Sequence, residues 1–105
     1  MREYEIMFIL RPDLDKDKMS GVLSKIKEIF SKYGAQEISF YMWAEKRKLA
    51  YPIRSSGAHK QKFEYGTYVL GNFKMPQDKL KNLDFDLHLV EEILRWLIVR
   101  KEERK

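Results

Sequence analysis

The sequence predicts an α+β domain, a sandwich in which one antiparallel sheet packs against helices. Three observations support this fold class. Short runs rich in β-branched and aromatic residues are typical of strands, one longer segment repeats apolar residues at helical spacing, and turn residues separate these segments. With 105 residues, the chain has the length of a single domain.

The N-terminal half is expected to form a strand, a helix and a second strand. Residues 4–10 are a short apolar run that suits a central strand with both faces largely covered. Asp13 or Asp15 can cap the following helix, and Gly34 can end it. Residues 36–44 alternate as a second strand. The apolar residues of the helix are Met19, Val22, Leu23, Ile26, Ile29, Phe30 and Tyr33.

The middle of the chain predicts a long connection and a third strand. Residues 46–61 contain proline, serines and glycine, which indicate an irregular connection of the kind that often carries function. Residues 63–73 form the third strand. Gly66 and Gly71 within it indicate a bulge or the close approach of another backbone.

The C-terminal segment allows two interpretations. Pro76 fits the first turn of a helix. Apolar residues from Leu80 to Leu97 would satisfy one long helix, whereas residues 93–99 would also form a strand covered on both faces, and periodicity alone slightly favours the helix. The strand alternative gives the order strand, helix, strand, strand, helix, strand. That order is the ferredoxin-like sandwich, a four-stranded antiparallel sheet with two helices on one face.

Positive charge is concentrated in one part of the chain. The 21 basic and 16 acidic residues give a net charge of +5. Residues 45–62 hold six basic residues and one acidic residue, so this segment accounts for the whole excess. A local contact with a polyanion is therefore the natural hypothesis. The primary candidates are Lys46, Arg47, Lys48 and Arg54, with Lys60 and Lys62 as further contacts.

Tyr51 lies within this basic segment. Its ring would be able to stack on an unpaired base or hydrogen-bond a sugar. The alternative is that it packs under the connection while Pro52 makes the turn rigid, and the residues favour neither over the other.

Other classes of function fit poorly. The sequence has no cysteine, which excludes disulfides and thiolate chemistry, and no apolar run reaches the roughly 18 residues that span a bilayer, so we expect a soluble protein. His59 and His88 have no accompanying ligand motif. Arg11 lacks the glycines of an anion cradle that an acylphosphatase-type enzyme needs. We expect no catalytic residue, no metal and no cofactor.

Several segments of the sequence resemble the bacterial ribosomal small-subunit protein six family. The resemblance covers residues 1 to about 100, and its most specific part is the run Arg47–Ile53. It identifies residues 93–99 as the last strand. The segments that carry it are Met1-Arg2-Glu3-Tyr4-Glu5, Arg47-Lys48-Leu49-Ala50-Tyr51-Pro52-Ile53, Gly66-Thr67-Tyr68-Val69 and Phe73-Lys74-Met75-Pro76.

The resemblance implies a non-catalytic protein of the cytoplasmic ribosome. It implies binding to the central domain of small-subunit ribosomal RNA as a heterodimer with small-subunit ribosomal protein eighteen, and it adds Arg2 to the candidate RNA contacts. Two departures from the family pattern stand out. The loop over residues 54–64 is a few residues longer than the usual family pattern, and the C-terminal extension is only the charged tail 101–105. We expect residues 1–100 to form a single domain.

The uncovered face of the sheet is a candidate partner surface. It would carry more aromatic and apolar side chains than one small core needs, and such patches often mark interfaces. Alternatively, these side chains are buried in a larger core, and the sequence favours neither possibility over the other. An RNA-recognition-motif-like or self-associating module without catalysis remains the alternative function, although the third strand lacks the residue order of that motif. The candidate partner residues are Tyr41, Trp43, Tyr68 and Leu97.

Overall fold

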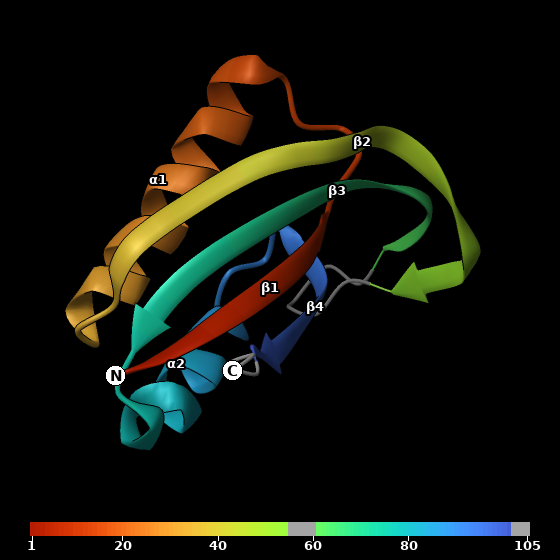
Figure 1. The fold of residues 1–105 in the computed structure, drawn as a ribbon. Helices are drawn as coiled ribbons and strands as arrows, with labels where there is room; N and C mark the ends of the chain where they lie inside the picture. Colours follow the sequence, from red (N-terminus) through yellow and green to blue (C-terminus); the bar gives the residue numbers. More distant parts are fainter. Residues whose placement is uncertain (55–60, 102–105) are drawn as a thin grey trace.

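The fold is a four-stranded antiparallel sheet with two helices packed against one face (Figure 1). The computed structural model describes residues 1–54 and 61–101. Its elements are β1 (Arg2–Leu10), α1 (Lys16–Lys32), β2 (Gln36–Arg54), β3 (Lys62–Met75), η1 (Gln77–Lys79), α2 (Leu80–Leu87) and β4 (Ile93–Arg100). The strand order β2-β3-β1-β4 makes β1 and β3 central and leaves β2 and β4 at the edges. The predicted ferredoxin-like sandwich is thus confirmed.

Capping residues set both ends of α1. Asp15 Oδ1 accepts a hydrogen bond from the backbone N–H of Lys18 at 2.8 Å, which satisfies one of the free donors of the first turn. Gly34 follows the helix with a φ of 84°, a left-handed conformation that glycine adopts without a steric penalty. The cap is therefore Asp15 rather than Asp13, and Gly34 ends the helix as predicted.

The main core lies between the helices and the sheet. At its centre the ring of Phe30 meets those of Phe73 and Phe40 edge-on, with centroids 4.7 and 5.5 Å apart. Aromatic pairs favour this geometry because the positive edge of one ring faces the negative face of the other. Phe8 and Phe30 are fully buried. One aromatic cluster therefore joins α1 to three strands.

β1 is a central strand, as predicted, but only one of its faces is fully covered. Tyr4, Ile6 and Phe8 are buried in the main core. On the opposite face Glu5 is exposed, Met7 is partly buried, and Ile9 is the one buried residue of β1. We call this helix-free side of the sheet the open face.

The C-terminal segment is a strand, not part of the long helix that periodicity slightly favoured. β4 pairs antiparallel with β1, placing Leu97 opposite Met7. The physical reason is tertiary, because the edge of β1 supplies hydrogen-bond partners for the backbone of β4 while Ile93 and Leu94 become buried. Pro76 is the N-cap of η1 and precedes the first turn instead of lying within it.

The prediction of an irregular connection over residues 46–61 is wrong for residues 46–54, which belong to β2. Pairing with β3 continues there through register shifts. Lys46 lies at one shift with a φ of 47°, and its backbone N–H donates to Thr67 Oγ1 at 3.3 Å. Pro52 is tolerated because β2 is an edge strand, where a missing N–H need not cost a ladder bond. Residues 55–60 lie outside the described chain.

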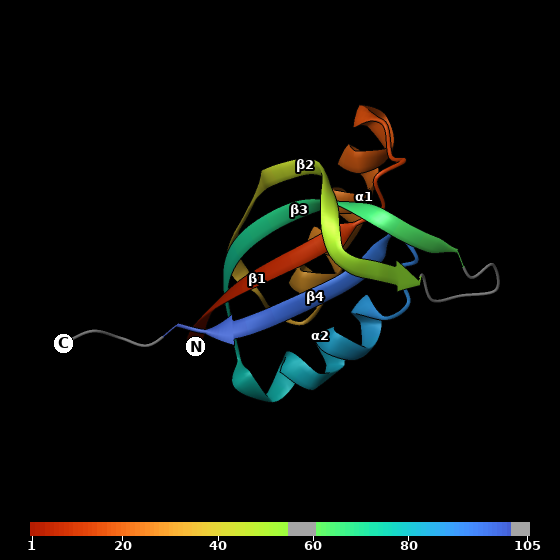
Figure 2. The same cartoon turned by 90° about the vertical axis from the view of Figure 1, so that its right-hand side faces the viewer.

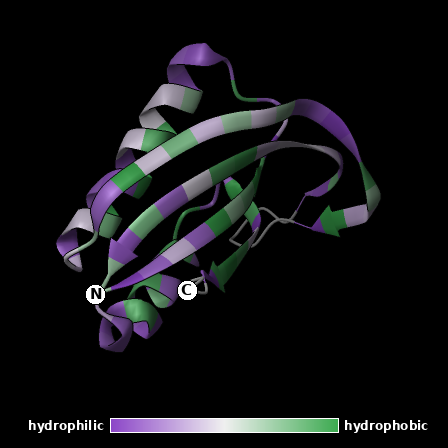
Figure 3. Cartoon of the chain, viewed as in Figure 1, coloured by the Kyte–Doolittle hydropathy of each residue, from purple (hydrophilic) through white to green (hydrophobic). Residues whose placement is uncertain are grey.

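The far end of β2 bends across the open face (Figure 2). Leu49 and Ile53 are buried there in a second cluster with Ile9 of β1 and Leu94 of β4. Figure 3 shows a hydrophilic stretch where β2 bends and hydrophobic residues beyond it. One edge strand of the sheet therefore reaches the opposite edge strand.

Candidate nucleic-acid interface

Five basic side chains occupy the bent end of β2 and the start of β3. We call them the basic arm. All five are exposed, and none forms a salt bridge with any residue in the described parts of the chain. Arg54 lies directly opposite Lys62, an arrangement of like charges that a bound anion would relieve. The residues of the basic arm are Lys46, Arg47, Lys48, Arg54 and Lys62.

Arg47 is held over an aromatic pair. Its guanidinium carbon lies over the ring of Trp43, 5.1 Å from the ring centroid. Trp43 in turn contacts Tyr68 edge-on, with centroids 5.5 Å apart. The cation–π contact leaves the guanidinium N–H groups able to bind an acceptor while the aromatic ring fixes the position of the side chain. Arg47 is thereby positioned beside two candidate partner residues.

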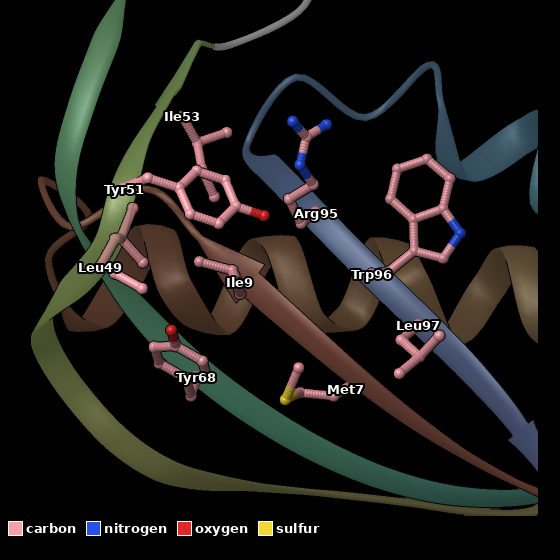
Figure 4. A pocket seen from close by; sticks show the side chains of 10 residues that line it. Met7, Ile9, Leu49, Tyr51, Ile53, Tyr68, Arg95, Trp96 and Leu97 are labelled. Carbon is pink, nitrogen blue, oxygen red and sulfur yellow. The ribbon is translucent and has the colours of Figure 1, made fainter.

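Tyr51 lies on the rim of a hollow between the bent end of β2 and the open face. The hollow has a volume of about 220 Å³, and its lining includes Met7, Ile9, Tyr68 and Leu97 (Figure 4). The side chain of Tyr51 is 65% exposed. It is therefore not enclosed under a connection, and its ring is accessible from solvent.

Among the basic candidates in the described residues, Arg2 does not join the basic arm. Arg2 lies at the opposite end of the sheet, paired in register with Met75, and its Nε donates to Gln77 Oε1 at 2.9 Å. Lys60 lies outside the described residues. Of the basic candidates that the structure describes, those on β2 and β3 lie together, and Arg2 lies apart from them.

The four candidate partner residues share the open face. Tyr41, Trp43 and Leu97 are each more than half exposed, while Tyr68 is partly buried. Tyr41 and Leu97 line one shallow hollow together with Leu70. The alternative that this face is buried in a larger core is correct only at one end, where the bent end of β2 covers Ile9. The rest is an exposed apolar and aromatic surface.

Sequence reasoning missed Arg95. This β4 residue lines the hollow beside Tyr51, and it also lines a groove that contains Arg54. Figure 4 shows its side chain rising from β4 between Ile53 and Trp96. No local signal would have found it, because its position depends on the bend that brings β2 to β4.

The groups with shifted pKa values lie away from the basic arm. Asp86 accepts hydrogen bonds from the Tyr33 hydroxyl at 2.7 Å and from Lys32 Nζ at 3.3 Å. The bond from Tyr33, followed by that from Lys32, lowers the pKa of Asp86, and the bonds to Asp86 raise the pKa values of Tyr33 and Lys32. These contacts join the end of α1 to α2 and are structural.

Two kinds of feature are missing from residues 1–54 and 61–101. No group of three or more histidine, aspartate and glutamate side chains is arranged to hold a metal ion. No helix in these ranges has the length and apolar character required to cross a membrane.

Comparison with known proteins identifies the family. The profile described as ribosomal protein S6 matches residues 3–100. The small ribosomal subunit protein bS6 of Campylobacter lari is 40% identical over 105 residues, covering all of this chain and 78% of the relative. The bS6 protein of Caldanaerobacter subterraneus is 36% identical over 103 residues, covering 98% of this chain and all of the relative.

A solved structure agrees with this result. The crystal structure of 30S ribosomal protein S6 from Thermotoga maritima superimposes with a TM-score of 0.77 at 26% identity, covering 95% of this chain and 87% of that one. The chain therefore belongs to the bacterial ribosomal protein S6 family, whose members are structural, non-catalytic constituents of the small ribosomal subunit in the cytoplasm.

Proposed function

We propose that this chain binds the central domain of small-subunit ribosomal RNA through the basic arm and Tyr51, as a heterodimer with small-subunit ribosomal protein eighteen. The observation that carries the proposal is the basic arm itself, five exposed cations without an acidic partner in the described chain. Arg2 would touch the RNA at a separate point. The role is structural and requires no cofactor or catalytic residue.

The chemistry of the arm suits a sugar–phosphate backbone. Lysine binds phosphate as a point charge and arginine as a two-pronged donor, and each neutralised phosphate releases condensed counterions. Arg47, which is already positioned by Trp43, would lose less side-chain freedom on binding than a free arginine. Tyr51 would stack on an unpaired base. Binding should therefore weaken steeply as the salt concentration rises.

The open face is proposed as the partner surface. Tyr41, Trp43 and Leu97 expose apolar area beside the basic arm, so one partner would cover the face while RNA follows the arm. Aromatic residues with a few flanking charges are typical of the buried centre of an interface.

The RNA contact is tested with the quadruple variant K46A/R47A/K48A/R54A in complex with the partner. Titration of a central-domain RNA fragment at several KCl concentrations should show weaker binding and a salt slope reduced by roughly 3 to 4, about 0.9 for each lost phosphate contact. The control K16A/K18A/K25A/K81A removes the same charge from the helices and should keep the slope. An unchanged slope for the first variant would refute the assignment.

The partner surface is tested with Leu97→Glu. A carboxylate placed in a buried apolar contact should weaken heterodimer formation at least tenfold in a calorimetric titration. Leu89→Glu is the matched control, because Leu89 is 67% exposed and lies beyond α2, outside the sheet. Equal affinities for the two variants would place the partner elsewhere.

A further inference from the structure

We infer that Arg95 and Arg54 together form a clamp for a phosphodiester of RNA, in a groove between the bent end of β2, β4 and α2. The inference rests on the proposed RNA-binding function and deepens it, because it adds a contact from the opposite edge strand. It assigns Arg95 a role that its sequence neighbourhood does not suggest.

The fold brings the two arginines into one groove. Arg54 is the last residue of β2, and Arg95 lies near the start of β4. These strands are the two edges of the sheet, yet both side chains line a groove of about 330 Å³ whose other walls include His88 and Trp96. The buried contact of Ile53 with the cluster that contains Leu94 holds the end of β2 in this place.

The charges of the groove are unbalanced. Arg54 and Arg95 are exposed, and neither forms a salt bridge within residues 1–54 and 61–101. Asp84, whose Oδ1 accepts the indole N–H of Trp96 at 2.8 Å, also lines the groove and offsets one of the two positive charges, so an excess of one remains. Both arginines that line the groove are positively charged, and an anion bound between them would be attracted by both.

Aromatic rings form the wall beside the arginines. His88 meets Trp96 edge-on with centroids 4.5 Å apart, and its Nδ1 donates to the backbone carbonyl of Asp84 at 2.9 Å, since a carbonyl oxygen only accepts. Both rings are therefore fixed in position. Two fixed aromatic rings next to paired cations suit a ribose or base attached to the bound phosphate.

The groove continues the surface of the basic arm, which favours RNA over a free anion. Arg54 belongs to both, and Arg95 also borders the hollow whose rim carries Tyr51 (Figure 4). A nucleic-acid backbone presents phosphates in series, so it would occupy the arm and the clamp at once. An isolated phosphate would contact only the two arginines of the clamp.

The test uses the full chain with its partner and a central-domain RNA fragment. R95Q should weaken binding roughly tenfold and lower the salt slope by about 1, whereas the matched control R100Q, at the far end of the same strand, should leave both unchanged. R95K should recover part of the slope but not the full affinity, because lysine lacks the two-pronged geometry. If R95Q and R100Q behave alike, the clamp is refuted.

Trp96 supplies a second readout. In a W43F background it is the remaining tryptophan of the two in the chain, so its emission reports on the groove. A short single-stranded RNA should change this emission at concentrations at which inorganic phosphate has no effect, and R95Q should abolish the change. An equal response to inorganic phosphate would identify an anion site without preference for RNA.

The outcomes separate this inference from the proposed function. If the unmodified complex does not bind the RNA fragment, the proposed function fails. If it binds and R95Q retains both affinity and salt slope, only the clamp fails. The circular dichroism spectrum of R95Q should match that of the unmodified chain. The substitution changes an exposed side chain that forms no salt bridge within the described residues, so the fold should be kept.

Discussion

Gly66 and Gly71 show how single residues control the packing of the sheet. A Cβ atom at Gly66 would lie 2.4 Å from Cγ2 of Ile9, and one at Gly71 would lie 2.4 Å from Cδ1 of Phe40. The sequence predicted a bulge or a close backbone at these positions. The pairing of β2 with β3 does shift register next to Gly66, as predicted, and a neighbouring side chain lies over each glycine. Glycine is used here because the space of a Cβ is already filled.

Gly66→Ala should therefore destabilise the protein by about 1–3 kcal/mol, the usual cost of overpacking a well-filled core. Gly21→Ala is the matched control, because nothing lies within 4 Å of its Cβ position in the interior of α1. That substitution should raise the stability by about 0.5–1 kcal/mol. Urea unfolding measures both changes, and a loss of stability in both variants would contradict the packing argument.

At the scale of elements, the two helices are joined by a polar contact as well as by the core. Asp86 of α2 accepts a hydrogen bond from the Tyr33 hydroxyl and forms a salt bridge with Lys32, both at the end of α1. The local signals of α1, its cap and its apolar spacing, were readable from sequence. The partner of its last turn was not, because Lys32 and Asp86 are 54 residues apart.

The Asp86 contact should make stability depend on pH in the acid range. The hydrogen bonds lower the pKa of Asp86 in the folded state, so its stabilisation is complete above the unfolded pKa and is lost as the pH falls through the folded one. Asp86→Asn should thus have a lower urea midpoint than the unmodified chain at pH 7, and the difference should shrink toward pH 2. A difference independent of pH would show that the carboxylate charge is not involved.

The element boundaries show where local patterns fail. The strand identity of residues 93–99 could not be decided from apolar spacing, because a strand covered on both faces and a helix place apolar residues at overlapping positions. Likewise, Pro52 and the basic residues of β2 have the composition of a loop. Both segments are strands because they pair with a neighbour that is distant in sequence.

At the scale of the whole molecule, the bent end of β2 divides the open face. One end of the face becomes a second small core around Leu49 and Ile53, and the other stays exposed around Tyr41 and Leu97. This division places a cationic surface next to an apolar one. The proposed contacts with RNA and with a protein partner would use these two neighbouring surfaces.

We propose that residues 1–100 form the single domain and that residues 101–105 are dispensable for folding. A chain that ends at Arg100 loses the hydrogen bond from the Lys101 backbone N–H to the Glu3 carbonyl at 3.0 Å, so it should unfold with a free energy lower by no more than about 1 kcal/mol. A chain that ends at Lys101 keeps this bond and should match the full length. A larger loss in either variant, measured by urea unfolding, would extend the domain into the tail.

The sequence by itself determined β1, α1, β3 and the first part of β2, the glycine that ends α1 and the concentration of charge, because each depends on neighbouring residues or on periodic burial. The tertiary structure decided that residues 93–99 are a strand, that β2 bends over the open face, and that Arg95 joins Arg54. These features depend on which strand edges and apolar surfaces remain free after the other elements have packed, and that information is not local to any segment.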